Sequence, residues 1–283
     1  MKYLDNLDMR NEEIVREEVA KFKISGGGTI VDVTPHMGDS RNPQLLKRIS
    51  EATGVNIVMG CSWYVAAAHP LEIEFFSELE LCELIVRDIT HGSNDTEIRS
   101  GIIGEVGTGD PLLSSEIKVL RASTRAHLIT GCPMNIHMAA GCHQVMPVLD
   151  IIESEGVKDL SKVVISHMDV KLDLSQQREV IARGAIVEYD TFGHEHYPDS
   201  RGFRMPSDTD RIDGISTLAS EGLLSSILVS HDVCLKHLWS KYGGRGYIPL
   251  ITDLQSVFKS RGFGNSELQR LLVANPRKLL SFI

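Results

Sequence analysis

Seven short runs rich in β-branched residues alternate with longer amphipathic segments along this chain of 283 residues. The runs are apolar on both faces, and each is followed by a segment with helical periodicity. A strand that is apolar on both faces is typical of a parallel sheet that helices cover on both sides. We therefore predict the α/β class, with strands at residues 29–35, 56–64, 100–108, 133–138, 162–168, 185–192 and 226–233.

Two parallel architectures could hold these repeats. An open doubly wound sheet usually carries a glycine-rich phosphate loop after its first strand, whereas the GGGT at 26–29 precedes a strand. The alternative is a (β/α)8 TIM barrel, typically of about 250 residues. The helix predicted at 11–25 fits helix 1 of a barrel whose strand 1 is absent from this chain. No linker interrupts residues 1–283, so we predict a single barrel domain that is truncated at its N-terminus.

Composition predicts a cytoplasmic protein with a small-molecule partner. The formal net charge of −9 argues against a broad nucleic-acid surface, and no apolar run approaches the ~20 residues of a membrane span. The N-terminus is acidic and polar, unlike a signal peptide. The five cysteines form no C-x-x-C pair, which is typical of reduced thiols in the cytosol. The sequence leaves open whether the protein forms a homodimer.

Polar side chains stand at the ends of four predicted strands: Glu105 in IIGEV, His137 in MNIH, His167 in VVISH and Asp232 in ILVSHD. They are one, one and two repeats apart, each of about 30 residues, the length of a βα unit. Parallel strands would therefore bring all four to one barrel mouth. Two imidazoles and two carboxylates suit a divalent transition metal, with zinc, manganese and cobalt all compatible. The alternative is that each residue is polar because it caps the next helix.

The motifs that surround these residues are GGGTIVDVTP, NIVMGCSWYV, GIIGEVG, the histidine of NIH, ISHMD, EYDTFG, ILVSHDVC, KYGGRGY and LLVANPRKLLSF. Together they resemble the phosphotriesterase-like branch of the amidohydrolase superfamily, which includes lactonases and phosphotriesterase-related proteins. The resemblance runs from about residue 10 to the C-terminus. It implies a metallohydrolase barrel with two metals, most often zinc. In it Glu105 bridges the metals, His137 and His167 hold the more exposed one, and Asp232 holds the buried one.

The resemblance also implies an H-x-H motif at the end of strand 1, and this chain begins after that point. The chain does contain another H-x-H, in GHEHYP at 193–198. That pair follows the strand at 185–192, in a loop over the predicted barrel mouth. There His194 and His196 would contact a substrate oxygen, replace a lost metal ligand, or be solvated. We expect solvated loop histidines.

Three further residues are candidates for substrate contact. Trp63 and Tyr64 end the strand at 56–64, where an aromatic ring would either line the pocket or pack in the core. Arg245 lies in YGGRGY after the last strand, where it would read an anionic substrate group or be solvated.

The expected function is metal-dependent hydrolysis of an ester-like bond, in the first place that of a lactone. Metal-activated hydroxide would attack, with Asp232 as the general base. Two alternatives stay open. One is a catalytically impaired isoform or pseudoenzyme that binds a ligand or a partner. The other is a barrel enzyme that uses a single metal, for example in deamination or decarboxylation.

Overall fold

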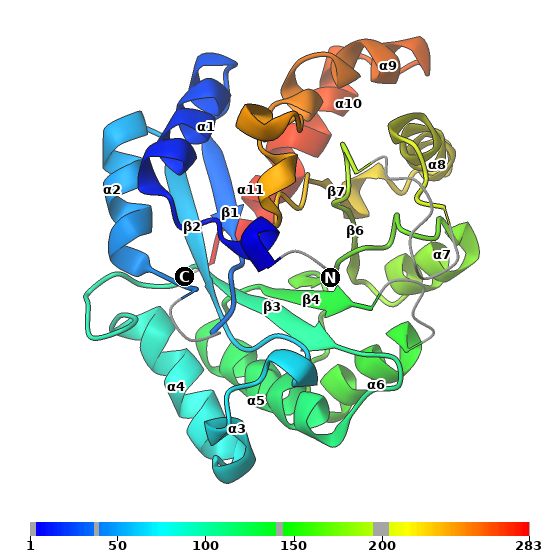
Figure 1. Cartoon of the computed structure of the whole chain (residues 1–283). Coiled ribbons are helices and arrows are strands. Elements are labelled where there is room, and N and C mark those ends of the chain that lie inside the picture. Colours follow the sequence, from blue (N-terminus) through cyan, green and yellow to red (C-terminus); the bar gives the residue numbers. More distant parts are fainter. Residues whose placement is uncertain (1–3, 37–39, 140–143, 195–203, 283) are drawn as a thin grey trace.

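The predicted strands form one curled parallel sheet in the computed structural model, which describes residues 4–36, 40–139, 144–194 and 204–282. The strands are β1 (Thr29–Asp32), β2 (Asn56–Cys61), β3 (Ile102–Thr108), β4 (Met134–Met138), β5 (Val163–Ile165), β6 (Ile186–Tyr189) and β7 (Ile227–Val229). They neighbour one another in chain order, and every pair is parallel. The sheet curls into an incomplete barrel with helices outside it (Figure 1). The predicted α/β barrel class is confirmed.

Helices cover the outside of the sheet. The main ones are α1 (Glu12–Ile24), α2 (Pro43–Thr53), α3 (Glu72–Phe75), α4 (Glu78–Thr90), α5 (Ser114–Thr130), α6 (Val145–Ser154), α7 (Leu174–Ala182), α8 (Asp208–Ser220), α9 (Leu254–Ser260), α10 (Asn265–Gln269) and α11 (Asn275–Leu280). Local sequence sets their ends. The Asn42 side chain accepts the Leu45 N–H at the start of α2, and Gly54 ends that helix with φ 67°. Within the described ranges, no helix is long and apolar enough to cross a membrane.

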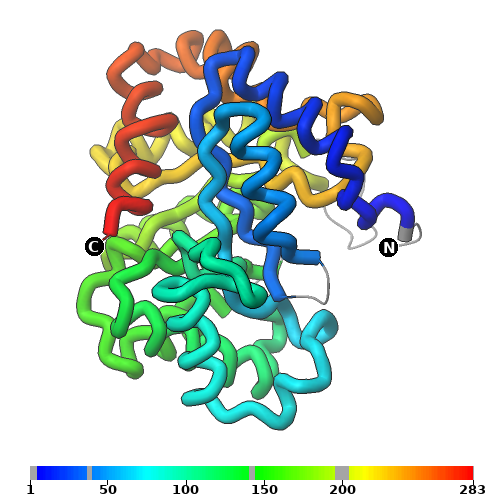
Figure 2. Tube along the Cα trace, turned by 90° about the vertical axis from the view of Figure 1, so that its left-hand side faces the viewer, coloured from blue at the N-terminus to red at the C-terminus, as the bar shows by residue number. Residues whose placement is uncertain are grey.

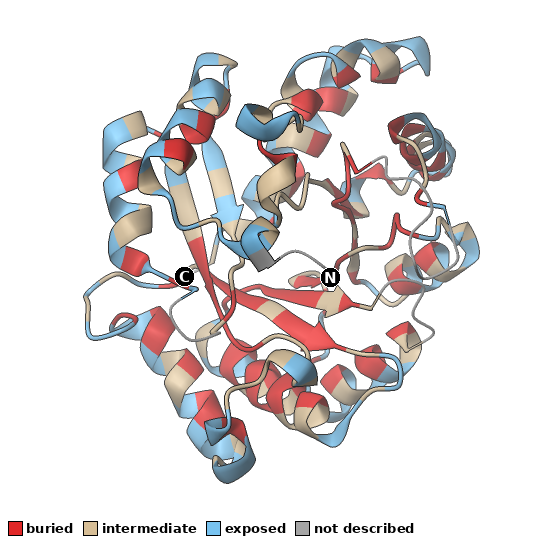
Figure 3. Ribbon diagram, in the orientation of Figure 1, coloured by how far each residue is buried: buried red, intermediate tan, exposed pale blue. Residues whose placement is uncertain are grey.

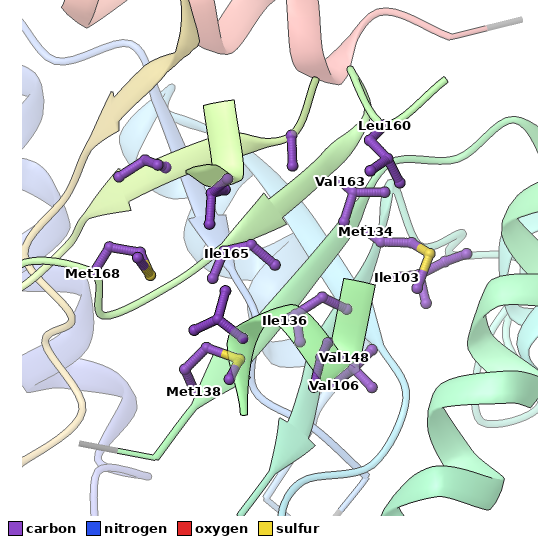
Figure 4. Close-up of a cluster of buried hydrophobic side chains, with 14 of the residues drawn as sticks. Ile103, Val106, Met134, Ile136, Met138, Val148, Leu160, Val163, Ile165 and Met168 are labelled. Carbon is purple, nitrogen blue, oxygen red and sulfur yellow. The ribbon is translucent and has the colours of Figure 1, made fainter. Parts of the chain in front are cut away.

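The central strands are buried on both faces. All of β5 is buried, and in β3 the single partly exposed residue is Glu105. Figure 3 shows this continuous buried region across β3 and β4. The apolar side chains of these strands pack against one another and against α6 (Figure 4): Ile103, Val106, Met134, Ile136, Met138, Val148, Val163 and Ile165. A rigid core therefore supports this side of the barrel.

Strands β1 and β7 are the two edges of the sheet. Among the described residues no strand pairs with the outer side of either. The residues of β1 alternate between exposed and half-buried, and Val31 is 39% exposed. A cavity of about 2450 Å³ is lined by both edges, by Ile30 and Val31 on one side and by Leu228 and Val229 on the other. This gap lies where an additional strand would complete the barrel.

The start of the chain contacts the far side of this gap. Buried Glu18 in α1 accepts hydrogen bonds from the backbone N–H groups of Ser240 (3.0 Å) and Lys241 (3.1 Å), which follow β7. Asn6, in the short turn η1 (Leu4–Leu7), accepts one from the backbone N–H of His237 at 2.9 Å. Figure 2 shows the blue start of the chain beside this orange segment. Among the described residues, side-chain contacts and no strand ladder join the first and last parts of the barrel.

Candidate metal centre

Glu105, His137 and His167 face one another inside the barrel, on and after the neighbouring strands β3, β4 and β5. Glu105 Oε1 lies 3.1 Å from His137 Nδ1 and 3.2 Å from His167 Nε2. The same two ring nitrogens are 2.8 Å apart. One donor atom from each residue thus lies within 4.8 Å of the other two. All three side chains are partly buried and line the large cavity.

Asp190, which directly follows β6, orients the His167 ring. Its Oδ1 lies 2.9 Å from His167 Nδ1, and its Oδ2 accepts the His167 backbone N–H at 3.0 Å. Because a carboxylate only accepts hydrogen bonds, Nδ1 carries the hydrogen. The His167 nitrogen that faces Glu105 and His137 is therefore Nε2. A carboxylate behind a ligating histidine is the usual support in metal sites.

The charges at this cluster favour a cation. Burial raises the pKa of Glu105, but the neighbouring His137 and His167 outweigh burial and bring it down to about 2. Burial lowers the pKa of His167, but Asp190 and Glu105 outweigh it and raise the pKa well above its usual range. Glu105 thus stays ionised at neutral pH and favours positive charge on the His167 ring. A divalent ion in the same space would supply that charge, so one carboxylate and two imidazoles fit a zinc-type site.

Asp232 lines the same cavity but lies outside the cluster of three. It follows β7 with φ 42°, a left-handed conformation. Burial raises the pKa of Asp232 to about 8, with His167 opposing the shift and Asp190 and Glu105 adding to it. Within the described chain, its carboxylate is not among the donor atoms that lie within 4.8 Å of one another. Its predicted role as a fourth ligand stays a proposal.

The two consecutive aromatic residues after β2 point in different directions. The Tyr64 hydroxyl lies 3.2 Å from His137 Nε2, and the two rings meet edge to face at 4.5 Å. Trp63 is instead buried in the core and stacks on His36 at 5.2 Å. Tyr64 therefore faces the candidate metal centre, whereas Trp63 takes the core position that was its alternative.

The H-x-H in the loop after β6 differs from the expectation of solvated histidines. His194 is buried, with 7% of its surface exposed. Its Nε2 lies 2.8 Å from the carbonyl oxygen of His231 and 3.0 Å from that of Asp232. The expectation is wrong for His194, because the ring fits between the β6 and β7 loops and makes hydrogen bonds there. His196 lies outside the described residues.

Arg245 is engaged in ion pairs. Its guanidinium lies 2.6 Å from an Asp208 carboxylate oxygen and also pairs with Asp253. Asp208, at the start of α8, further pairs with the fully buried Arg211. The proposed reading of an anionic substrate by Arg245 would have to compete with these two carboxylates.

A polar network below the candidate metal centre has no counterpart in the sequence analysis. Asn135 Nδ2 donates to Glu188 Oε2 at 2.8 Å, and the Ser166 hydroxyl lies 3.0 Å from the same oxygen. Burial, and then the charge of Asp190, raises the pKa of Glu188 to about 8. Asn135 lies on β4, Ser166 directly after β5 and Glu188 on β6, and all three carry polar groups into the barrel interior.

Asp190 was not predicted from the sequence, although a signal for it is present. Asp190 is the residue directly after β6, at the end of the strand that follows β5, and it lies within the quoted motif EYDTFG. The strand-end rule applied to the other four residues would have selected it. Its support of His167 depends on side-chain geometry, which the motif does not contain.

Known proteins resemble this chain in sequence and in structure. The model of the phosphotriesterase family matches residues 2–280. An N-acetyltaurine hydrolase from Homo sapiens is 38% identical over 282 residues, which cover 98% of this chain and 80% of that protein. A resiniferatoxin-binding protein from Rhodobacter sphaeroides has a TM-score of 0.94 at 34% identity, over 98% of this chain and 77% of the other. A lactonase from Listeria monocytogenes has a TM-score of 0.88 at 26% identity, over 99% and 89%.

Proposed function

Because this chain belongs to the phosphotriesterase family, we propose that it is a metal-dependent hydrolase of a small-molecule amide or ester. The observation that carries the proposal is the convergence of Glu105, His137 and His167 within 4.8 Å. Relatives named as hydrolases support the class of reaction.

Glu105, His137 and His167 would hold the metal, and Asp232, which lines the same cavity, would be available as a further ligand or as the proton acceptor. Zinc is the first choice for this donor set, and manganese and cobalt bind similar groups. When bound, such an ion supplies Lewis acidity, which polarises a carbonyl oxygen and makes water easier to deprotonate. A set of three protein donors leaves room for substrate and water.

The residues around the cluster would divide the remaining work. The positive charge of a bound metal ion would lower the pKa of Asp232 from about 8. Its carboxylate would then take the proton of the attacking water and pass it to the leaving nitrogen or oxygen. One C–O bond forms and one C–N or C–O bond breaks, so the products are an acid and an amine or alcohol. The Tyr64 hydroxyl, beside His137, would donate to the substrate's carbonyl oxygen.

Two substrates deserve direct comparison. N-acetyltaurine is the first, since relatives at 36% to 38% identity carry the name N-acetyltaurine hydrolase. It is an amide whose other end carries a sulfonate. A lactone is the second, as predicted from the motifs and supported by the 26% identical lactonase. The same donor set serves either bond, because both reactions pass through a tetrahedral carbonyl adduct.

The proposal is tested with metal analysis and turnover on one preparation of the 283-residue protein. We expect a chelator to remove hydrolysis of N-acetyltaurine or γ-butyrolactone, and added Zn²⁺, Mn²⁺ or Co²⁺ to restore it. Glu105→Gln should abolish both metal content and turnover. Glu153→Gln, in a surface ion pair with Arg183, is the matched control and should change neither.

One result would favour the non-catalytic alternative. The 34% identical protein whose structure is named as that of a resiniferatoxin-binding protein supports ligand binding as the alternative role. If the protein binds no metal and hydrolyses neither substrate, yet binds a small hydrophobic ligand, the hydrolase proposal fails.

A further inference from the structure

The segment between β6 and α8 contacts both of its neighbours in the sheet. β6 lies between β5 and β7, and the residues that follow those two strands, His167 and Asp232, both have left-handed backbones, with φ 61° and 42°. Side chains other than glycine rarely adopt this conformation, so surrounding contacts must hold it. Asp190 bonds to His167 on one side, and His194 reaches Asp232 on the other.

His194 contacts the two peptide groups that flank Asp232. The carbonyl of His231 belongs to the peptide before Asp232, and the carbonyl of Asp232 belongs to the peptide after it. One ring nitrogen, Nε2, lies 2.8 Å from the first oxygen and 3.0 Å from the second. Carbonyl oxygens only accept, so Nε2 carries a hydrogen that both share. This contact restrains the backbone on both sides of Asp232 and hence the direction of its carboxylate.

The His194 ring is itself held by a buried network. The backbone N–H of Gly193 donates to Asp208 at 2.8 Å, and the N–H of His194 donates to the carbonyl of Thr191 at 3.0 Å. Fully buried Arg211 pairs with that same Asp208 and donates to the Thr191 hydroxyl at 2.7 Å. His194 is thus fixed from its own side before it contacts Asp232.

We propose that His194 is a positioning residue that holds Asp232 in its left-handed conformation and so aims the carboxylate into the cavity. His194 acts through Asp232 and does not contact substrate. This role rests on the proposed hydrolase function, in which Asp232 accepts and delivers a proton.

Three substitutions separate the hydrogen bond from the volume of the ring. His194→Phe keeps a ring but removes the donor. His194→Gln places an amide N–H near the position of Nε2, within reach of the two carbonyl oxygens. The shorter side chain of His194→Asn places its N–H near the position of Nδ1, from which it does not reach them. His127→Phe is the matched control, because His127 is also buried and bonds a carbonyl, that of Cys132 at 2.7 Å, before β4 at the other end of the barrel.

We expect His194→Phe and His194→Asn to lower kcat about 10–100-fold, the usual effect of losing a residue that hydrogen-bonds to an active-site group. The KM of both variants should stay within about twofold of the wild-type value. His194→Gln should recover most of kcat. His127→Phe should lower the melting temperature and leave kcat within about twofold. In the Asp232→Asn background His194→Phe should have no further effect on kcat, because both changes remove the same contribution.

A rise in KM at constant kcat would make His194 a substrate contact and overturn the proposal. So would full additivity with Asp232→Asn, or a loss of stability alone, as in His127→Phe. Imidazole ¹⁵N NMR provides a readout independent of turnover, and we expect hydrogen on Nε2 of His194. Hydrogen on Nδ1 alone would refute the contact. If the wild-type protein hydrolyses neither N-acetyltaurine nor γ-butyrolactone, the proposed function fails, while the NMR result still decides whether His194 holds the Asp232 peptides.

Discussion

Strands β3 and β1 belong to the same sheet but have opposite surroundings. β3 is buried at every residue except Glu105 and has a hydrogen-bonded neighbour on each side. β1 pairs with β2 alone among the described strands, and its residues alternate between exposed and half-buried. The three clustered donors lie on the closed side, on and after β3, β4 and β5. Asp232 lies on the open side, after β7. The three clustered donors thus stand on the paired, buried side of the sheet, whereas Asp232 stands at its edge.

Ligand geometry and barrel closure are therefore separate properties of the chain. The cluster of three donors needs only the closed side, where ladder hydrogen bonds and core packing hold each strand. The open side relies on single contacts, such as Glu18 to Ser240 and His194 to the Asp232 peptides. Changes on the two sides should therefore have different consequences.

The largest expected effect is on metal affinity. Zinc binding in small structural sites yields ~10–16 kcal/mol, or about 3 kcal/mol per ligand for four ligands. His137→Ala on the closed side should therefore weaken Zn²⁺ binding by roughly 100-fold. Asp232→Asn on the open side should keep Zn²⁺ affinity within about tenfold while kcat falls about 10²–10⁴-fold. Competition with a chromophoric chelator measures both variants, and equal losses of affinity would show that the open side is an equal partner in binding.

A pair of core substitutions tests the contrast in packing. Ile136→Ala removes a side chain that is fully buried in β4, and should lower the free energy of unfolding by ~2–5 kcal/mol. Val31→Ala, at a position 39% exposed in β1, should change it by less than about 0.5 kcal/mol. Urea denaturation of both variants gives the comparison. A large cost at Val31 would mean that the gap is filled in solution.

A strand supplied to the gap between β1 and β7 should reduce the difference in stability between the open and the closed side. A segment of five or six alternating β-branched residues, joined to the N-terminus or added as a peptide, could pair with the free edges of β1 and β7. Burying its inward side chains should stabilise the protein by roughly 2–3 kcal/mol, which raises the melting temperature by about 5–10 °C. The same segment with proline at alternate positions cannot donate to the ladder and is the control. Equal shifts from both segments would argue against strand pairing.

The smallest expected effect concerns acid sensitivity at the open side. Burial raises the pKa of Glu18, but hydrogen bonds from Ser240, Lys21 and Lys241 outweigh it and bring the pKa below its ordinary value of 4.5. A carboxylate with a lowered pKa stabilises the fold above its unfolded pKa and loses that contribution as the pH falls through the folded value. Glu18→Gln should therefore cost about 1 kcal/mol at pH 7 and progressively less below pH 4.5. Unfolding curves at pH 7 and pH 3.5 decide this, and a cost independent of pH would assign Glu18 a packing role.

Local sequence patterns determined the positions of the seven strands and of the helix at 12–24. Apolar periodicity, β-branched runs and capping residues act over a few neighbouring residues, so each is readable without the fold. The strand-end rule also singled out Glu105, His137 and His167, because a parallel sheet places equivalent strand ends at one mouth. Applied to β6, the same rule would have included Asp190.

Tertiary structure alone decided which of these side chains meet and what each one does. Trp63 and Tyr64 are adjacent in sequence, and only the curl of the sheet sets which one faces His137. The H-x-H of GHEHYP reads as a solvated pair, yet His194 is buried because the loops after β6 and β7 pack together. Arg245 reads as a free cation, yet Asp208 and Asp253 come to it from elsewhere in the chain. Such contacts join residues far apart in sequence, and their hydrogen bonds and desolvation exist only once the chain is folded.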